Sequence, residues 1–214
     1  MKCIYCHHDK TYLLNDQQRK CAKCKRKFSP KKLAKQAQIK EAFLQGLSAT
    51  KAAKIHKMHY LTVQKQYMHF RKQLLLHADT LYQQHAQNVK EYDEYLYLPK
   101  SIKHFDNNMH KMRHFLTLSY ETKVYTIMMP TIARYELQLK DEKEKKQLSK
   151  YLRFNKIAKL KKSQNTITEF WAFFENFIIC YKGISQENFI YYLKEAEWRF
   201  NYEERERRMI LSLI

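Results

Sequence analysis

The residues with the clearest chemistry are four cysteines near the start of the chain, arranged as two Cys-x-x-Cys pairs: Cys3, Cys6, Cys21 and Cys24. Two such pairs at this separation can place four thiolates around one tetrahedral zinc ion. The segment around them is too short and too polar to hold a hydrophobic core, so we expect the metal to fold it. His7 and His8 are alternative ligands, although four cysteines already complete the shell. The pattern predicts a zinc ribbon over residues 1–29 with structural Zn²⁺.

Two other uses of paired cysteines fit the sequence less well. Disulfides need an oxidising compartment, and the N-terminus lacks the apolar run of a secretory signal. A thioredoxin-like site would place one Cys-x-x-Cys within a βαβ pattern, and no such pattern is nearby. We therefore expect a cytoplasmic protein. The fifth cysteine, Cys180, lies in an aromatic run and is predicted to be a small buried hydrophobe.

The positive charge of the chain is concentrated in its first third. The whole chain has 41 Lys+Arg and 21 Asp+Glu, a net of +20. Residues 1–77 contain eighteen Lys+Arg and three acids, a net of +15, which leaves +5 for the rest. A lysine-rich surface kept for solubility would explain a diffuse excess, but not one concentrated beside a metal site. We expect this part to bind a polyanion, with release of condensed counterions.

Three helices are predicted to follow the ribbon. Apolar residues recur at helical spacing over about 31–45, 48–56 and 60–77. In the third helix these positions are Leu61, Val63, Tyr67, Phe70 and Leu74. A short helix, a tight turn and a longer helix, with alanines where the two cross, are typical of a helix-turn-helix DNA-binding domain, here residues 30–77. A plain three-helix bundle is the alternative.

In a helix-turn-helix, the second helix of the motif enters the major groove with its first residues toward the bases. The residues predicted to meet base edges are Tyr60, Thr62, Gln64 and Lys65. The residues predicted to contact phosphates are Arg71 and Lys72 on the same helix and Lys25, Arg26 and Lys27 beside the ribbon. Phe28 is predicted to pack on the ribbon instead. Double-stranded DNA is therefore the expected partner.

The remaining chain is predicted to be an α+β domain over residues 88–214. Three β-rich segments, 89–98, 114–120 and 123–129, are predicted to form an antiparallel meander. A highly charged helix over 136–150 and a less regular piece, 151–160, come next. From Thr166 onward the chain is predicted to be helical, with core-facing stripes at Phe170, Phe174, Phe177, Phe189, Leu193, Ala196 and Phe200. No stretch approaches the ~20 apolar residues of a membrane helix, and no small-molecule cofactor is expected.

The order of these elements resembles that of bacterial insertion-sequence transposases of the zinc-ribbon DDE group. Besides the paired cysteines and Phe28, the resemblance depends on three segments near the end of the chain: Asn165-Thr-Ile-Thr-Glu169-Phe-Trp171, Tyr181-Lys-Gly183-Ile-Ser185, and Tyr192-Leu-Lys-Glu195 with Arg199-Phe-Asn201. It covers both ends of the chain and implies a ribonuclease H-like catalytic domain with a shortened centre.

The resemblance implies two Mg²⁺ ions held by two aspartates and a helical glutamate. Asp93 would be the first ligand and Glu169 the third. The second aspartate is missing: between the meander and Glu169 the chain has only Asp141, in a charged helical run, and Asn155, whose amide is a weak Mg²⁺ ligand. On the residues alone, Asp93 could face solvent from an edge strand, and Thr166 and Glu169 could form a helix capping box.

Three hypotheses follow. The first is a transposase that binds the ends of its element and cuts or joins strands with Mg²⁺. The second is a transposase-derived, catalytically inactive DNA-binding regulator. The third is a zinc-ribbon regulator whose C-terminal domain binds a partner or ligand. Whether the chain is an enzyme is left open by the missing aspartate, and homo-oligomerisation is left open as well. In each case we expect the protein to be cytoplasmic and associated with the nucleoid.

Overall fold

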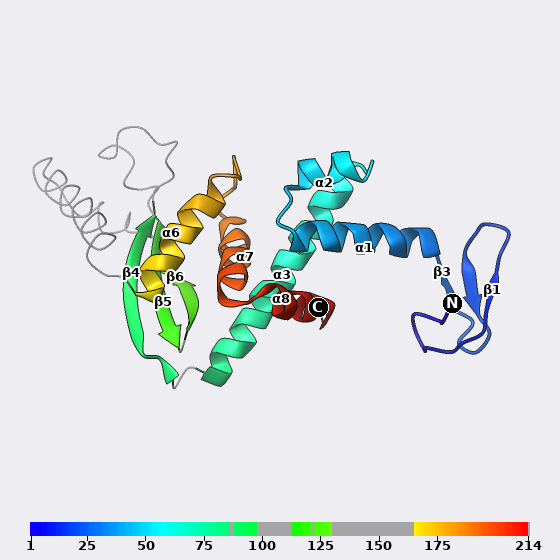
Figure 1. Cartoon of the computed structure of the whole chain (residues 1–214), viewed down its shortest axis with the longest axis horizontal. Coiled ribbons are helices and arrows are strands. Elements are labelled where there is room, and N and C mark those ends of the chain that lie inside the picture. Colours follow the sequence, from blue (N-terminus) through cyan, green and yellow to red (C-terminus); the bar gives the residue numbers. More distant parts are fainter. Residues whose placement is uncertain (86–87, 98–112, 121, 130–164, 214) are drawn as a thin grey trace, which may run out of the picture. The chain divides into compact units, whose positions relative to one another are not determined.

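The computed structural model describes residues 1–85, 88–97, 113–120, 122–129 and 165–213 (Figure 1). It is a mixed α+β structure with two small antiparallel sheets. The chain divides into two compact units, Met1–Tyr67 and Met68–Ile214. The predicted boundaries, after residues 29 and 77, do not coincide with this division. The predicted helix at 136–150, the piece at 151–160, Asp141 and Asn155 lie outside the described residues.

The first unit begins with a three-stranded sheet in the order β1-β2-β3 and continues into helices. Its elements are β1 (Thr11–Leu13), β2 (Arg19–Cys21), β3 (Lys27–Phe28), α1 (Pro30–Leu44), α2 (Ala49–Ile55) and the start of α3 (Tyr60–His85). The predicted first and second helices are confirmed as α1 and α2. Each has a serine at its N-cap, since Ser29 accepts a hydrogen bond from the Lys32 amide and Ser48 one from the Lys51 amide, both at 3.3 Å.

The helical core of this unit is small and aromatic. Phe43 of α1 and Tyr67 of α3 meet edge to face, with ring centroids 4.9 Å apart. Ala52 of α2 and Val63 of α3 are fully buried. Leu61 departs from its predicted core position, because its side chain is 51% exposed.

The third helix is longer than predicted. We expected it to end near His77, but α3 continues to His85. Its last two turns pack on the sheet of the second unit. There Ala78 and Tyr82 contact a cluster of three side chains from the sheet strands, Leu118, Tyr120 and Tyr125. The rings of Tyr82 and Tyr125 stack with centroids 4.2 Å apart. These contacts explain why the helix continues beyond the predicted end.

The second unit is built on the predicted antiparallel meander, which is confirmed. The strands are β4 (Glu91–Tyr97), β5 (Arg113–Tyr120) and β6 (Lys123–Met128), in the order β4-β5-β6, and the helices after them are α6 (Thr166–Ile178), α7 (Phe189–Asn201) and α8 (Glu204–Leu213). Alternation along each strand gives the sheet two covered faces. One face packs on α3, as described above. The other packs on α6 and α7 through the predicted aromatic stripes (Figure 1).

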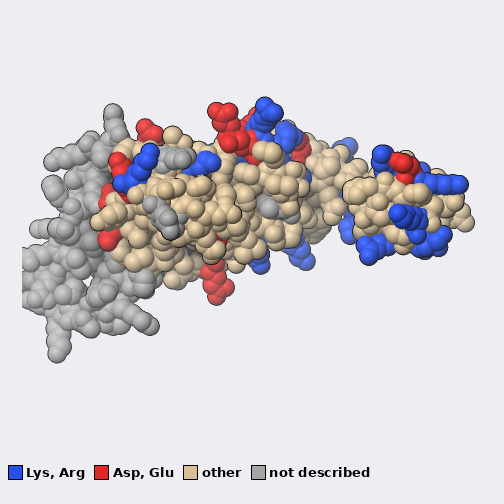
Figure 2. All heavy atoms as spheres, turned by 90° about the horizontal axis from the view of Figure 1, so that it is seen from below, with Lys and Arg blue, Asp and Glu red and all other residues tan. Residues whose placement is uncertain are grey.

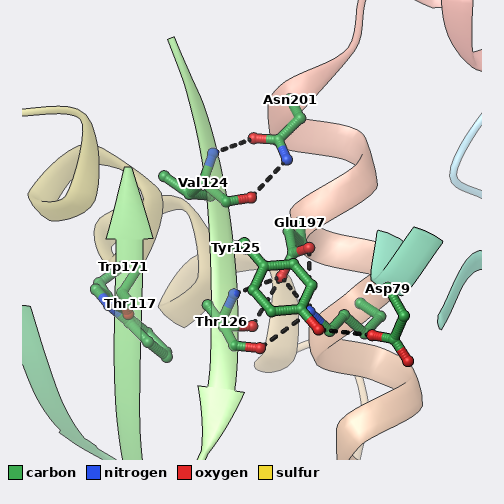
Figure 3. A network of polar contacts seen from close by, with 9 residues as sticks. Asp79, Thr117, Val124, Tyr125, Thr126, Trp171, Glu197 and Asn201 are labelled. Atoms are coloured by element: carbon green, nitrogen blue, oxygen red, sulfur yellow. Dashed lines mark hydrogen bonds and ion pairs between the residues drawn. The ribbon is translucent and has the colours of Figure 1, made fainter. Parts of the chain in front are cut away.

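The core on the α6 side is centred on Trp171. Its indole stacks on the Tyr95 ring of β4 with centroids 3.9 Å apart. Its Nε1–H donates to the buried Thr117 hydroxyl of β5 at 2.9 Å (Figure 3). The Tyr95 hydroxyl in turn donates to Glu175, so that the polar atoms of both stacked rings have partners. These contacts fix α6 against the strand that carries Asp93.

Candidate metal centre and nucleic-acid interface

The four predicted metal ligands come together in one cluster. The sulfurs of Cys3, Cys6, Cys21 and Cys24 all lie within 4.8 Å of one another. Two of the distances, Cys3 to Cys24 and Cys6 to Cys21, are 3.6 Å. A tetrahedral zinc ion with Zn–S bonds of about 2.3 Å separates its sulfurs by roughly 3.8 Å, so the cluster has the right size for one such ion. None of the four cysteines forms a disulfide, and neither His7 nor His8 belongs to the group.

The two Cys-x-x-Cys turns share a local geometry that points amides at sulfur. The Tyr5 amide donates to the Cys3 sulfur at 3.4 Å, and the Lys23 amide to the Cys21 sulfur at 3.3 Å. The residue after each pair, His7 and Lys25, has a positive φ of 56° and 59°. This conformation raises the backbone energy of a non-glycine residue. Both turns adopt it where the chain bends around the four sulfurs.

Backbone amides also favour the metal-binding form of one of the thiols, that of Cys21. Burial acts to raise the pKa of Cys21, but the backbone N–H groups of Cys24 and Lys23, helped by the neighbouring thiols, lower it to about 6. Amide hydrogen bonds that favour a thiolate favour the form that binds a metal. Phe28 closes the other side of the cluster, as predicted, because it is buried against Cys3 and Cys21 with Leu33 beside it.

Most residues predicted to contact DNA are accessible. Tyr60, Thr62 and Lys65 on the first turns of α3 are exposed, and Gln64 between them is half-buried. Lys25, Arg26, Lys27 and Lys72 are also exposed. In Figure 2 lysine and arginine side chains gather over the ribbon, with few acidic side chains among them. The N-terminal turns of α3 are among its exposed parts, as they would have to be if this end of the helix met base edges.

Arg71 is a correction to the predicted phosphate contacts. Its side chain is buried, and its Nε donates to the Glu195 carboxylate of α7 at 2.6 Å. Its guanidinium also lies 3.9 Å from the centroid of the Tyr192 ring. Burial acts to lower the pKa of Arg71, but Glu195 and the neighbouring tyrosines raise it overall. A guanidinium enclosed in this way cannot reach a phosphate, so the prediction for Arg71 is wrong. Helical phase alone did not reveal its partner, which lies 124 residues away in sequence.

Asp93 lies on β4, half-buried, on the face of the sheet that packs on α6. It is directly opposite the buried Thr117 in the β4–β5 register. Its Oδ1 accepts a hydrogen bond from the Glu94 amide at 2.8 Å. Asp93 therefore does not simply face solvent. It lies on the same face of β4 as Tyr95, whose ring stacks on Trp171.

Glu169 is exposed in the first turn of α6. The N-cap of this helix is Asn165, whose Oδ1 accepts from the Thr168 amide at 3.0 Å, so a capping box headed by Thr166 is wrong by one residue. The side-chain Nδ2 of Asn165 also donates to the Glu91 carboxylate of β4 at 3.3 Å, which connects the start of α6 to the strand that carries Asp93. Within the described ranges, Asp93 and Glu169 do not belong to any group of three ligating side chains.

Cys180 is a second correction. The structure exposes this side chain, although its aromatic neighbours suggested burial. Helix α6 ends at Ile178, and Cys180 falls in the turn that follows, outside the phase of the buried stripe. Gly183, three residues later, has a φ of +70° that favours glycine and redirects the chain toward α7.

Comparisons with known proteins add no relative: no protein-family model, curated protein or solved structure matches this chain. Of the helices that the structure describes, none has both the length and the apolar composition needed to cross a membrane. The cysteine cluster is thus the site that the geometry supports best.

Proposed function

We propose that this chain is a transposase-type DNA-binding protein whose N-terminal unit grips duplex DNA. The observation that carries the proposal is the exposed first turn of α3, with Tyr60, Thr62 and Lys65 accessible on a helix-turn-helix whose neighbour is a four-cysteine metal centre. Helices of this kind read base edges with their first residues and leave phosphate contacts to flanking cations. Lys25, Arg26 and Lys27 supply such cations beside the metal centre.

The charge of the first third supports a polyanionic partner. The net of +15 over residues 1–77 becomes +13 when one Zn²⁺ binds four thiolates, because the complex carries a charge of −2. Binding through phosphate contacts releases counterions, so affinity for duplex DNA falls steeply as salt rises. If the natural partner were instead a neutral or acidic protein, the affinity of this chain for random duplex DNA would not be expected to fall so steeply with salt.

The test is selection from a random duplex pool by the zinc-loaded, full-length protein. We expect enrichment of related sequences, and we expect Gln64→Ala and Lys65→Ala to lose preference for the selected pool over the starting pool. Lys182→Ala is the control, since Lys182 is exposed in the second unit and outside the motif. If wild-type protein binds no duplex at low ionic strength, the proposal fails. If both α3 variants weaken binding to the two pools equally, these side chains contact only the backbone.

The body of the protein has two candidate roles. In the transposase role, Asp93 and Glu169 would hold Mg²⁺, which would activate a water or a 3′-hydroxyl for phosphoryl transfer. In the alternative role the body is catalytically inactive and the chain is a zinc-ribbon, helix-turn-helix regulator. The anchoring of α6 to β4 through Asn165 and Glu91 supports the first role. The lack of a third ligating side chain beside Asp93 and Glu169 among the described residues supports the second.

A nicking assay separates the two roles. Supercoiled plasmid carrying a selected sequence is incubated with the protein and Mg²⁺. An active enzyme nicks it, and Asp93→Asn and Glu169→Gln abolish nicking without reducing binding. Glu187→Gln, an exposed acid in the turn before α7, is the control and should leave nicking unchanged. Retained binding without any nicking by wild-type protein would favour the inactive regulator. A DNA affinity that responds to an added small molecule would favour a ligand-controlled regulator.

A further inference from the structure

The outward face of the ribbon sheet carries one aromatic and two basic side chains, one from each strand. The register pairs Tyr12 of β1 with Lys20 of β2, and Lys20 with Lys27 of β3, so these three side chains form a row. The alternate positions, Cys21 and Phe28, turn toward the metal centre. We call the row of Tyr12, Lys20 and Lys27 the ribbon face.

Two half-exposed tyrosines on this part of the ribbon each have a cation near the ring. Tyr12 is 50% exposed, and Lys10 Nζ lies 5.8 Å from its centroid. Tyr5 is 47% exposed, with the Arg26 guanidinium 5.2 Å from its centroid. The Tyr5 hydroxyl donates to the Lys27 carbonyl oxygen at 3.4 Å and its ring meets the Phe28 ring edge to face, so this second tyrosine lies beside β3.

The ribbon does not need Tyr12 for its own fold, because the buried cluster consists of the cysteines and Phe28. The acids of the ribbon are also outside the row. Asp9 pairs with Lys2 at 3.2 Å, and Asp16 accepts from the Gln18 amide within its own turn. The ribbon face therefore presents aromatic surface and uncompensated positive charge together, which suits a partner with flat rings and negative charge.

Single-stranded nucleic acid is that partner. Its bases can stack on exposed aromatic rings while its phosphates meet lysines, whereas a duplex keeps the faces of its bases stacked on one another and leaves none for an aromatic ring. We propose that the ribbon face binds single-stranded DNA, with Tyr12 stacking on a base and Lys20 and Lys27 neutralising phosphates. The inference rests on the proposed function only in taking DNA as the polymer. It assigns Tyr12 and Lys20 a substrate different from that of α3, while Lys27 can meet phosphates of either form.

The test measures binding of the zinc-loaded, full-length protein to a labelled oligothymidine, which forms no duplex, and to a labelled random duplex. Tyr12→Ala should weaken oligothymidine binding by about 5- to 150-fold, the loss expected for one base–aromatic stack, and should leave duplex affinity unchanged. Tyr12→Phe keeps the ring and should bind oligothymidine as wild type does. The matched control is Leu13→Ala, because Leu13 is 67% exposed on the neighbouring position of the same strand and alternation points it to the opposite face.

Zinc content of each variant shows that the ribbon is intact. The inference is overturned if wild-type protein does not bind oligothymidine, if Tyr12→Ala and Leu13→Ala have the same effect, or if Tyr12→Ala weakens both probes equally. Gln64→Ala and Lys65→Ala distinguish it from the proposed function, because they should alter duplex recognition and leave oligothymidine binding unchanged. Oligothymidine binding without duplex binding would uphold the ribbon face and refute the duplex-reading α3.

Discussion

Asn201 at the end of α7 bonds both backbone groups of Val124 on β6. Its Oδ1 accepts from the Val124 amide at 2.8 Å, and its Nδ2 donates to the Val124 carbonyl oxygen at 2.7 Å (Figure 3). Glu197, one helical turn earlier, accepts from the Thr126 amide at 3.0 Å, and Lys194 donates to the Thr126 carbonyl oxygen at 2.9 Å. Helical side chains thus supply the hydrogen bonds that a neighbouring strand would otherwise give to β6.

Replacing Asn201 should destabilise the second unit. Asn201→Ala leaves the Val124 amide and carbonyl without partners, which costs about 1–3 kcal/mol of unfolding free energy. Urea unfolding followed by tryptophan fluorescence measures this unit alone, because both tryptophans, Trp171 and Trp198, lie in it. Gln186→Ala, which removes an exposed amide before α7, is the control. A loss no larger than that of the control would show that water replaces the Asn201 bonds at no cost.

Arg71 and Lys72 are neighbours with opposite expected effects. Among the described residues, Arg71→Met leaves the buried Glu195 with Arg199, 2.7 Å away, as its cation, and should lower the unfolding free energy by about 3 kcal/mol or more. Lys72→Met changes an exposed side chain and should alter stability by less than about 0.5 kcal/mol.

DNA titrations at several salt concentrations complete this comparison. If Lys72 contacts a phosphate, Lys72→Met reduces the salt slope of duplex binding by about one ion. Folded Arg71→Met protein should keep the wild-type slope. A reduced slope in the Arg71 variant alone would mean that the buried pair opens to reach DNA.

Metal binding should depend on Cys21 and not on Cys180. Cys21→Ser removes a buried ligand of the four-sulfur cluster and should abolish stoichiometric zinc, with loss of the ribbon fold. Cys180→Ser changes the exposed cysteine and should keep one zinc per chain. Elemental analysis and thiol titration after chelator treatment provide the measurement. Protein that keeps a folded ribbon with four free thiols and no metal would contradict the structural role of the ion.

Acidification should weaken the second unit through His77. Burial, with the nearby positive charge of Lys123, lowers the pKa of His77 below its ordinary value of 6.5. The unfolded chain then binds a proton more readily than the folded chain, so the unfolding free energy decreases as pH falls through 6.5 toward the lowered pKa. The stability of His77→Gln should depend less on pH between about 7 and 5, whereas His69→Gln, at an exposed site on α3, should behave as wild type. Equal pH profiles for all three proteins would assign the effect to other groups.

Features encoded by near neighbours in sequence were predictable. The two cysteine pairs and the strand pair β5–β6 depend on spacings of a few residues. The chain alternates along both strands of that pair and turns within three residues. Local spacing determines which side chains share a face, so the metal cluster and the meander followed from the sequence alone.

Features that depend on distant partners were not predictable in this way. Whether Arg71 faces solvent depends on Glu195, and how far α3 continues depends on Tyr125, 43 residues beyond Tyr82 in the chain. Leu61 has the helical phase of a core residue, but it lies in the first turn of α3 and is left exposed. Asp93 and Glu169 belong to the same class, because whether their carboxylates come together depends on how α6 meets β4.

The hydrogen bonds from α7 make the two edges of the sheet different, because they occupy backbone groups at the edge of β6. The outer edge of β6 is occupied by side chains, while β4, at the other end, has only β5 as a partner among the described strands. Among the described elements, therefore, the edge of β6 is closed to a further strand and the edge of β4 carries none. A strand paired with β4 would convert the strand of Asp93 from a border into an interior position.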